Sequence, residues 1–246
     1  MRVLLIVHDD DAGPGVFNEV LAGVEGQVES WVPGERPAAP APPGAYDAIM
    51  TFGGAAHPHQ EDRHPWLGAE KRFLADALEA TVPLLGICLG AELIAEVSGA
   101  AAQRLSRPEV GWYEVQLTAD GASDPLLGPA AASFPALEWH SYEVPLPPGA
   151  TALARSASCL QAYRIGHTAW GLQFHAEVTG GDFQHWLDTY SSDEDAVAAG
   201  IDPIAIAQET EDRIAAWNGL GRGICARFLQ VAAQTQGEDG HVREVL

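Results

Sequence analysis

Short apolar runs recur through the first hundred residues of the chain, separated by longer stretches of mixed polarity. Each run is mostly apolar and too short for a buried helix, so each is predicted to be a buried strand. The runs are RVLLIV (2–7), DAIMTF (47–52) and VPLLGI (82–87). A Pro- and Ala-rich stretch at 33–44 is predicted to be an exposed connection.

Two stretches beside these runs have the apolar spacing of amphipathic helices. Residues 65–80 begin with Pro, and residues 89–98 precede Gly99, which supplies a helix stop. Their apolar positions are Trp66, Phe73, Leu74 and Leu78 in the first stretch, and Leu89, Leu93, Ile94 and Val97 in the second. Strands that alternate with helices predict an α/β fold with a doubly wound, mostly parallel sheet, whose sites lie at the carboxyl ends of the strands.

The second half of the chain has a different pattern of apolar and polar residues. Short β-like segments at 111–118, 151–157, 160–166 and 168–174 predict an antiparallel β extension of the sheet. Residues 203–234 return to helical spacing, with core-facing positions at Ile204, Ile206, Ile214, Trp217, Ile224 and Phe228. Residues 1–246 are therefore expected to form one domain, with a catalytic core at 1–180 and a helical C-terminal extension at 181–246.

Composition and charge narrow the class of protein. The 246 residues carry 13 Lys and Arg against 34 Asp and Glu, a net charge of -21, which disfavours binding to nucleic acids and anionic membranes. No apolar run is long enough to span a bilayer, and no leader pattern is visible, so a cytoplasmic protein is expected. The 3 cysteines have neither disulfide nor zinc spacing, and no metal or cofactor is expected.

One cysteine lies where a strand is predicted to turn into a helix. Cys88 occupies the centre of GICLG, between Gly86 and Gly90, and glycines on both sides suit a sharp, crowded turn. Unpaired N–H groups at the helix start would favour its thiolate, so Cys88 is a candidate nucleophile. The alternative is a small buried cysteine in a Gly-rich turn.

A candidate base lies in GLQFHAEV. His175 and Glu177 are two residues apart near the end of a predicted strand, so their side chains leave the same face and Glu177 could orient the imidazole. A surface histidine beside a chance glutamate is the alternative.

Together, GICLGAELIA, WHSYEV and GLQFHAEV resemble the class I glutamine amidotransferases, most closely the stand-alone proteins similar to the amidotransferase domain of GMP synthase. The resemblance covers nearly the whole chain and implies a flavodoxin-like sheet with C-terminal helices. It also implies that Cys88, His175 and Glu177 form a triad that attacks glutamine, a small-molecule substrate. The expected products are ammonia and a γ-glutamyl thioester, which water hydrolyses to glutamate.

The resemblance further implies an oxyanion hole and a substrate pocket. The N–H groups of Leu89 and Gly54 would stabilise the oxyanion, and Gly53 would lie beside the substrate. An ordinary strand-ending turn is the alternative for residues 52–56. WHSYEV is expected to be a loop whose backbone contacts the substrate, and the alternative is a β-turn with a packed Trp139. The residues of this loop are His140, Ser141 and Tyr142.

Two positions depart from the family pattern, which usually has Gln at Glu92 and Pro at Ala176. An ionised carboxylate only accepts hydrogen bonds, so Glu92 could favour a substrate amino group. Glutamate at this position is also familiar in γ-glutamyl hydrolases, which makes a γ-glutamyl peptide hydrolase the second hypothesis. A catalytically silent regulatory or binding subunit is the third. The chain has no P-loop, so an ammonia acceptor would be a separate synthetase subunit.

Three other groups of residues give weaker indications of function. His57, His59 and His64 are expected to belong to a polar loop at the mouth of the site, and the acidic residues at 8–15 to a solvated turn. Cys159 and Cys225 are expected to be small buried hydrophobic residues.

Overall fold

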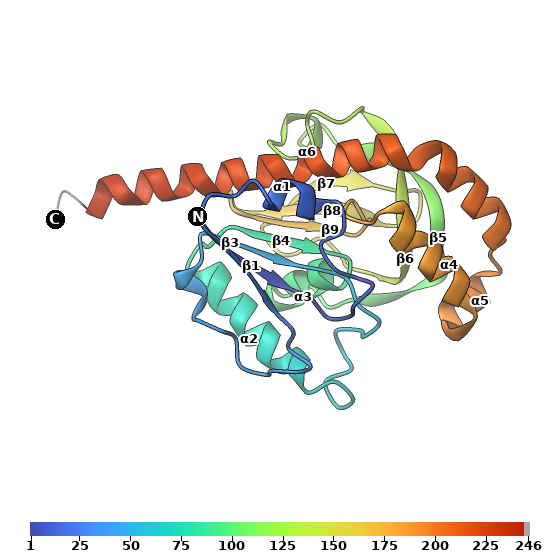
Figure 1. Cartoon of the computed structure of the whole chain (residues 1–246), viewed down its shortest axis with the longest axis horizontal. Helices are drawn as coiled ribbons and strands as arrows, with labels where there is room; N and C mark the ends of the chain where they lie inside the picture. The colour runs from blue at the N-terminus through green and yellow to red at the C-terminus, as the bar shows by residue number, and fades with distance from the viewer. Residues whose placement is uncertain (244–246) are drawn as a thin grey trace.

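A mixed nine-stranded sheet forms the centre of the computed structural model, which describes residues 1–243, with side chains to residue 235 (Figure 1). The strand order is β2-β1-β3-β4-β9-β8-β7-β5-β6. The parallel strands are β1 (Arg2–Ile6), β2 (Gln27–Trp31), β3 (Ala48–Thr51), β4 (Leu84–Ile87) and β9 (Ala169–Leu172). The antiparallel strands are β5 (Gln103–Leu117), β6 (Ser133–Glu143), β7 (Thr151–Arg155) and β8 (Leu160–Ile165). The predicted α/β fold with an antiparallel extension is confirmed.

Three strands differ from the sequence prediction. The edge strand β2 was not predicted, because most of its residues are polar and exposed. Residues 139–143 were expected to be a loop, but they belong to β6, where they pair with the long strand β5. β9 was assigned to the antiparallel extension, yet it lies parallel to β4 and antiparallel to β8. The places of these three strands in the sheet depend on pairing between segments far apart in the chain, which local sequence patterns do not encode.

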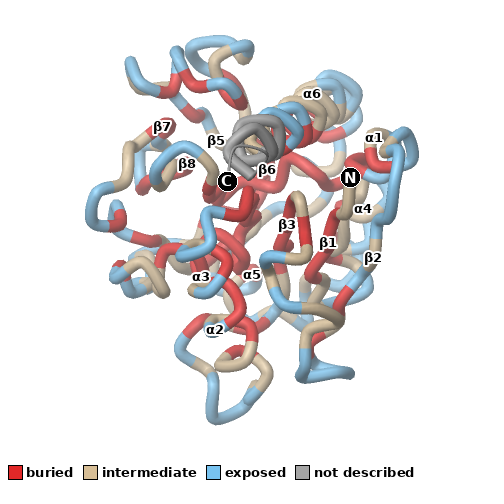
Figure 2. Tube along the Cα trace, turned by 90° about the vertical axis from the view of Figure 1, so that its left-hand side faces the viewer, coloured by how far each residue is buried: buried red, intermediate tan, exposed pale blue. Residues whose placement is uncertain are grey.

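Helices cover both faces of the sheet (Figure 1). The helices of the described chain are α1 (Phe17–Leu21), α2 (Trp66–Glu79), α3 (Leu89–Val97), α4 (Gly180–Thr189), α5 (Glu194–Ala199) and α6 (Pro203–Arg243). Short 3-10 turns lie at η1 (Pro43–Ala45), η2 (Gly121–Ser123) and η3 (Tyr190–Ser192). Alternate strand residues enter two separate apolar clusters: Leu4 packs with α2 and α3, and Leu5 packs with α1 and α6. Figure 2 shows the buried residues concentrated in the strands and on the inner sides of the helices.

The long helix α6 spans the sheet on one face (Figure 1). Trp217, Ile224 and Phe228 are buried there as predicted, and Ile206 and Ile214 pack partly buried against the same cluster. Ile204 was expected in the core but is 71% exposed, because it lies in the first turn of α6 and joins neither apolar cluster. None of the described helices combines the length and apolarity needed to cross a membrane.

Candidate active site

Cys88 lies on a strained turn between β4 and α3. Its φ of 49° is in the left-handed region that non-glycine residues rarely adopt. A Cβ atom at Gly86 would lie 2.6 Å from the Gly90 carbonyl carbon, and one at Gly90 would lie 2.2 Å from the Thr51 oxygen. Both glycines are therefore required by close backbone packing, and the strand-to-helix turn expected from GICLG is present.

His175 and Glu177 form a buried pair just beyond the end of β9. His175 Nδ1 lies 2.8 Å from Glu177 Oε1, and since a carboxylate only accepts, Nδ1 carries the proton. Two distant elements fix the backbone of the pair: the Val16 N–H donates to the Glu177 oxygen at 2.7 Å, and Trp217 Nε1 donates to the His175 oxygen at 2.8 Å. The second ring nitrogen, Nε2, is left for a different partner.

Cys88 and His175 are neighbours in space, next to Gly53. A Cβ atom at Gly53 would lie 3.0 Å from His175 Cε1 and 3.7 Å from Cys88 Cβ. Burial lowers the pKa of His175, but the charge of Glu177, together with the charge and hydrogen bond of Cys88, raises it to about 10. His175 can therefore hold a proton beside Cys88, which is the arrangement of a base next to a nucleophile.

The raised pKa of His175 makes stability depend on pH. The folded protein binds this proton more tightly than the unfolded chain, so the contribution is complete below pH 6.5 and is lost as the pH rises to about 10. Glu177→Gln removes the first of the two charges that raise the pKa, so the variant should lose less stability than the wild type over this window. Urea unfolding across the window measures the difference, with His185→Gln, an exposed histidine, as the control. Parallel curves for wild type and Glu177→Gln would contradict the expectation.

Two backbone N–H groups are free beside the turn. Neither the Leu89 nor the Gly54 N–H donates to another backbone group of the described residues. A Cβ atom at Gly54 would lie 3.3 Å from Leu89 Cδ2, which places the two residues side by side. This pair can serve as the two donors of an oxyanion hole.

His8, whose side chain is only 1% exposed and which the sequence did not single out, supports this loop. His8 Nδ1 donates to the Gly53 oxygen at 2.9 Å, and His8 Nε2 lies 2.8 Å from Glu70, which also accepts from Thr51 at 2.8 Å. Burial lowers the pKa of His8, but the charge of Glu70 raises it overall. No sequence signal joins His8 and Glu70, because one follows β1 and the other lies on α2.

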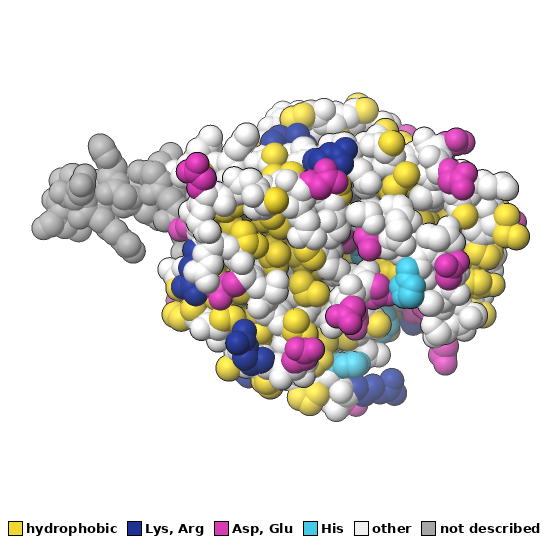
Figure 3. Space-filling view, in the orientation of Figure 1, with side chains coloured by type: hydrophobic (Ala, Val, Ile, Leu, Met, Phe, Trp, Pro, Cys, Tyr) yellow, Lys and Arg dark blue, Asp and Glu magenta, His cyan; other side chains and the backbone are white. Residues whose placement is uncertain are grey.

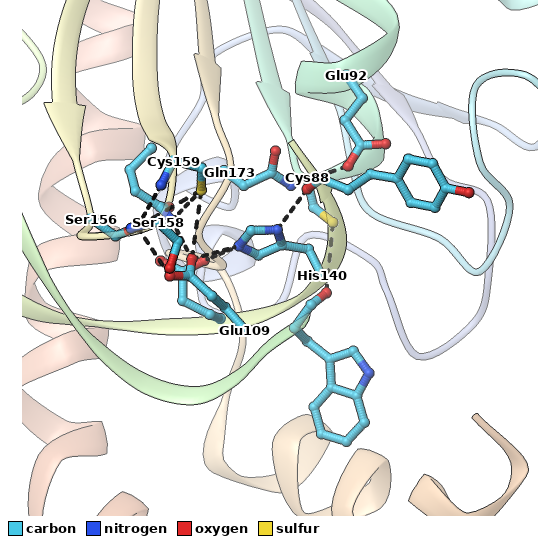
Figure 4. Close-up of polar contacts among 12 residues, drawn as sticks. Cys88, Glu92, Glu109, His140, Ser156, Ser158, Cys159 and Gln173 are labelled. Atoms are coloured by element: carbon cyan, nitrogen blue, oxygen red, sulfur yellow. Dashed lines mark hydrogen bonds and ion pairs between the residues drawn. The ribbon is translucent and has the colours of Figure 1, made fainter. Parts of the chain in front are cut away.

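Glu92 is one helical turn after Cys88, on α3, and is 3% exposed. Gln173 Nε2 donates to Glu92 Oε1 at 3.2 Å, and Oε2 has no hydrogen-bond partner among the described residues (Figure 4). Burial raises the pKa of Glu92, which the hydrogen bond from Gln173 only partly offsets. Gln173 was not singled out in the sequence.

His140 has its side chain in a buried polar network rather than in open space (Figure 4). Its Nδ1 donates to the Tyr142 oxygen at 2.7 Å, and Nε2 lies 3.1 Å from Glu109 and 3.3 Å from Glu138. Burial lowers the pKa of His140, but the two carboxylates raise it well above its usual value. The network holds the end of β6 against Cys88, whose Sγ lies 3.9 Å from the Trp139 oxygen.

Glu109, His140 and Cys159 offer ligand-type atoms within 4.8 Å of one another. These atoms already have proton donors: Gln161 Nε2 lies 2.8 Å from Glu109 Oε2 and 3.3 Å from Cys159 Sγ. Burial also raises the pKa of the Cys159 thiol, which opposes the thiolate that a metal would need. The cluster fits a hydrogen-bond network better than a metal site. Cys159 is buried as predicted, but in polar surroundings that the sequence did not indicate.

A cavity of about 640 Å³ brings most of the predicted site residues together. Those that line it are Cys88, His175, Gly54, Leu89, Glu92, His140, Ser141 and Tyr142. Gly53 and Glu177 stand behind this lining, against His175. Of the predicted polar loop, His57 lines the cavity. Asp9 and Asp11 also line it, so the acidic loop at 8–15, expected to be a solvated turn, is a wall of the site.

Known proteins resemble this chain in sequence and in fold. The family model described as glutamine amidotransferase class-I matches residues 29–189. The glutamine amidotransferase-like protein YfeJ of Salmonella typhimurium is 32% identical over 188 residues, which are 73% of this chain and 77% of that protein. A glutamine amidotransferase from Thermotoga maritima has a solved structure that superposes with a TM-score of 0.82 at 26% identity, covering 93% of this chain and 97% of that one.

Two further relatives carry more specific names. A gamma-glutamyl-L-1-hydroxyisopropylamide hydrolase from a Pseudomonas species is 30% identical over 150 residues, which are 57% of this chain and 50% of that protein. One subunit of a glutamine-hydrolysing GMP synthase from Sulfurisphaera tokodaii is 36% identical over 104 residues, 41% of this chain and 54% of that protein. The chain thus spans about half the length of these two relatives. Its flavodoxin-like α/β fold and the family match show that this chain belongs to the class I glutamine amidotransferases.

Proposed function

We propose that this protein hydrolyses a γ-glutamyl amide through a Cys88, His175 and Glu177 triad. The observation that carries the proposal is the position of Cys88 on a strained turn, next to a buried histidine whose other nitrogen is held by Glu177. A nucleophile, a base and an orienting carboxylate in this order are what acyl transfer through a covalent intermediate needs.

The reaction would proceed in two steps, formation of a thioester and its hydrolysis. The Cys88 thiolate attacks the γ-carbonyl carbon, and the resulting oxyanion accepts from the N–H groups of Leu89 and Gly54. His175 then gives its Nε2 proton to the leaving amine as the C–N bond breaks, which leaves a γ-glutamyl thioester. In the second step His175 takes a proton from water, the hydroxide attacks the thioester, and glutamate leaves as the thiolate is restored.

The choice of substrate depends on Glu92. Its unpartnered oxygen lies next to the cavity, where a carboxylate can accept from the α-ammonium group of a γ-glutamyl compound. The hydrolase relative from Pseudomonas, whose name specifies a γ-glutamyl amide of an organic amine, supports the same substrate class. The second candidate is a glutaminase that supplies ammonia to a separate synthetase subunit, which the likeness to the GMP synthase of Sulfurisphaera tokodaii supports.

A substrate panel tests the proposal. Glutamate release is measured from glutamine, γ-glutamyl alkylamides and γ-glutamyl dipeptides, and hydroxylamine traps the thioester as a hydroxamate. We expect alkylamides to be cut faster than glutamine, with hydroxamate formed from each substrate that is cut. A strong preference for glutamine would favour the ammonia-supplying role. If nothing in the panel is cut and no hydroxamate forms, the proposed hydrolase is wrong.

Glu92→Gln is expected to lower kcat/KM for γ-glutamyl alkylamides by about 10- to 100-fold. The variant exchanges a charged acceptor for a neutral amide, and a hydrogen bond to a charged group contributes about 1.5–3 kcal/mol. Glu96→Gln is the matched control, since Glu96 lies one turn further along α3, does not line the cavity and pairs with Lys71 at 2.6 Å. Equal kinetics for Glu92→Gln and wild type would remove Glu92 from substrate binding.

A further inference from the structure

The outer wall of the cavity is strongly acidic. Five carboxylates and one guanidinium line it, outside the buried Glu92. The carboxylates belong to Asp9 and Asp11, after β1, and to Asp193, Glu194 and Asp195, at the start of α5. Figure 3 shows acidic side chains gathered near histidines on this side of the molecule. We call these five carboxylates the acidic rim.

The charge of the acidic rim is poorly neutralised. Arg104 is the one guanidinium of the lining, and it forms an ion pair with Asp195. The Asp11 carboxylate lies 3.9 Å from Nε2 of the exposed His185. Asp193 accepts from Trp139 Nε1 at 2.8 Å and from backbone N–H groups of α5, and these neutral donors bring no compensating charge. Burial lowers the pKa of His57, a histidine of the lining, and so disfavours a positive charge on that ring. A surplus of negative charge therefore faces the cavity.

The cavity extends well beyond what the glutamyl group needs. Its volume of about 640 Å³ lies in the range of roughly 300–1,000 Å³ that holds drug-sized ligands. Cys88 and Glu92 both line the cavity and are buried, with exposures of 8% and 3%, so they define its inner end. Trp186 and Tyr142 add aromatic walls to the same cavity. The outer part is thus available to the leaving amine.

We propose that the preferred substrate is a γ-glutamyl amide whose leaving amine carries a second ammonium group, which the acidic rim binds. The inference rests on the proposed hydrolase activity and specifies its leaving group. Glu92 would accept from the α-ammonium group at the inner end, while the rim attracts the distal cation. A recess with walls of one charge sign concentrates oppositely charged substrates, with effects of roughly 10- to 1,000-fold on association.

Three amides of equal chain length isolate the effect of charge. They are the γ-glutamyl derivatives of 1,4-diaminobutane, butylamine and 4-aminobutanoate, which end in a cation, a methyl group and an anion. At low ionic strength kcat/KM for the cationic amide should exceed that for the neutral one by about tenfold, and the anionic amide should be slowest. The preference should shrink at about 1 M salt, where the Debye length is only about 3 Å.

A rim variant and a matched control complete the test. Asp11→Asn with Glu194→Gln should reduce the ratio of cationic to neutral kcat/KM at least about threefold, since it removes two rim charges. Asp76→Asn with Glu79→Gln removes two exposed charges near the end of α2, where they do not line the cavity, and should keep the ratio.

The outcomes separate this inference from the hydrolase proposal. A cationic to neutral ratio within twofold of one, a ratio unchanged in the rim variant, or a preference for the anionic amide would overturn the acidic rim as a specificity site while the hydrolase stands. Failure to cut any of the three amides or glutamine would instead reject the hydrolase itself.

Discussion

Cys88→Ser is expected to lower the rate of γ-glutamyl amide hydrolysis by at least about 10³-fold. A serine hydroxyl holds its proton far more tightly than a thiol, and His175 is arranged to stabilise a thiolate rather than to deprotonate an alcohol. Glutamate release under saturating substrate measures the loss. A glutamine-like electrophile with mass detection should label the wild type at Cys88 and leave the variant unlabelled.

Cys159→Ser is the matched control for this experiment. Cys159 is also a buried free cysteine, but it belongs to the Glu109 network and its raised pKa keeps it a thiol. The control should retain labelling at Cys88 and most of the activity. Full activity in Cys88→Ser, or labelling that disappears only in Cys159→Ser, would mean that the nucleophile has been wrongly assigned.

Gly90→Ala is expected to destabilise the protein by about 1–3 kcal/mol or more. The new Cβ atom would lie 2.2 Å from the Thr51 oxygen, and that carbonyl cannot move aside because β3 pairs with both β1 and β4. Any relaxation must shift the first turn of α3, and with it Cys88 and the Leu89 N–H. Urea unfolding measures the destabilisation, and the labelling rate of Cys88 reports the displaced turn.

Gly219→Ala provides the opposite result in the same experiment. Gly219 is also inside a helix, α6, but a Cβ atom there would meet nothing within 4 Å. Alanine should therefore stabilise the protein by roughly 0.5–1 kcal/mol, since it loses less backbone entropy on folding than glycine. Wild-type stability in Gly90→Ala would show that the turn is less tightly packed than these contacts require.

Local sequence patterns predicted the strands that are buried on both faces and the helices that cover one face of the sheet. β1, β3 and β4 are short apolar runs because they are buried on both faces of the sheet, and α2 and α3 show the spacing of helices that cover one face. The edge strand β2 has no such signal, since it is mostly exposed. Ile204 looked like a core residue for the converse reason: its spacing is helical, but its side chain is exposed and joins neither apolar cluster.

In the candidate site, too, local arrangements could be predicted from the sequence and contacts between distant segments could not. Cys88 in its glycine turn and His175 beside Glu177 are local arrangements, set by residues within a few positions of each other, so the sequence alone identified them. Their approach to one another depends on the parallel pairing of β4 with β9, which brings Ile87 opposite Leu172. That pairing joins segments far apart in the chain and was not predicted, since β9 was assigned to the antiparallel extension; only the family resemblance implied that the two segments meet.

By itself, the sequence determined the α/β fold, the strained turn that holds Cys88, and the carboxylate in place of an amide at Glu92. Only the tertiary structure decided what surrounds them. His8 and Glu70 meet beneath Gly53, Glu109 meets His140 across β5 and β6, and the loop after β1 joins α5 to form the acidic rim. The physical reason is that hydrophobic periodicity encodes which face of an element is buried, whereas charge and hydrogen-bond partners depend on which distant element packs against it.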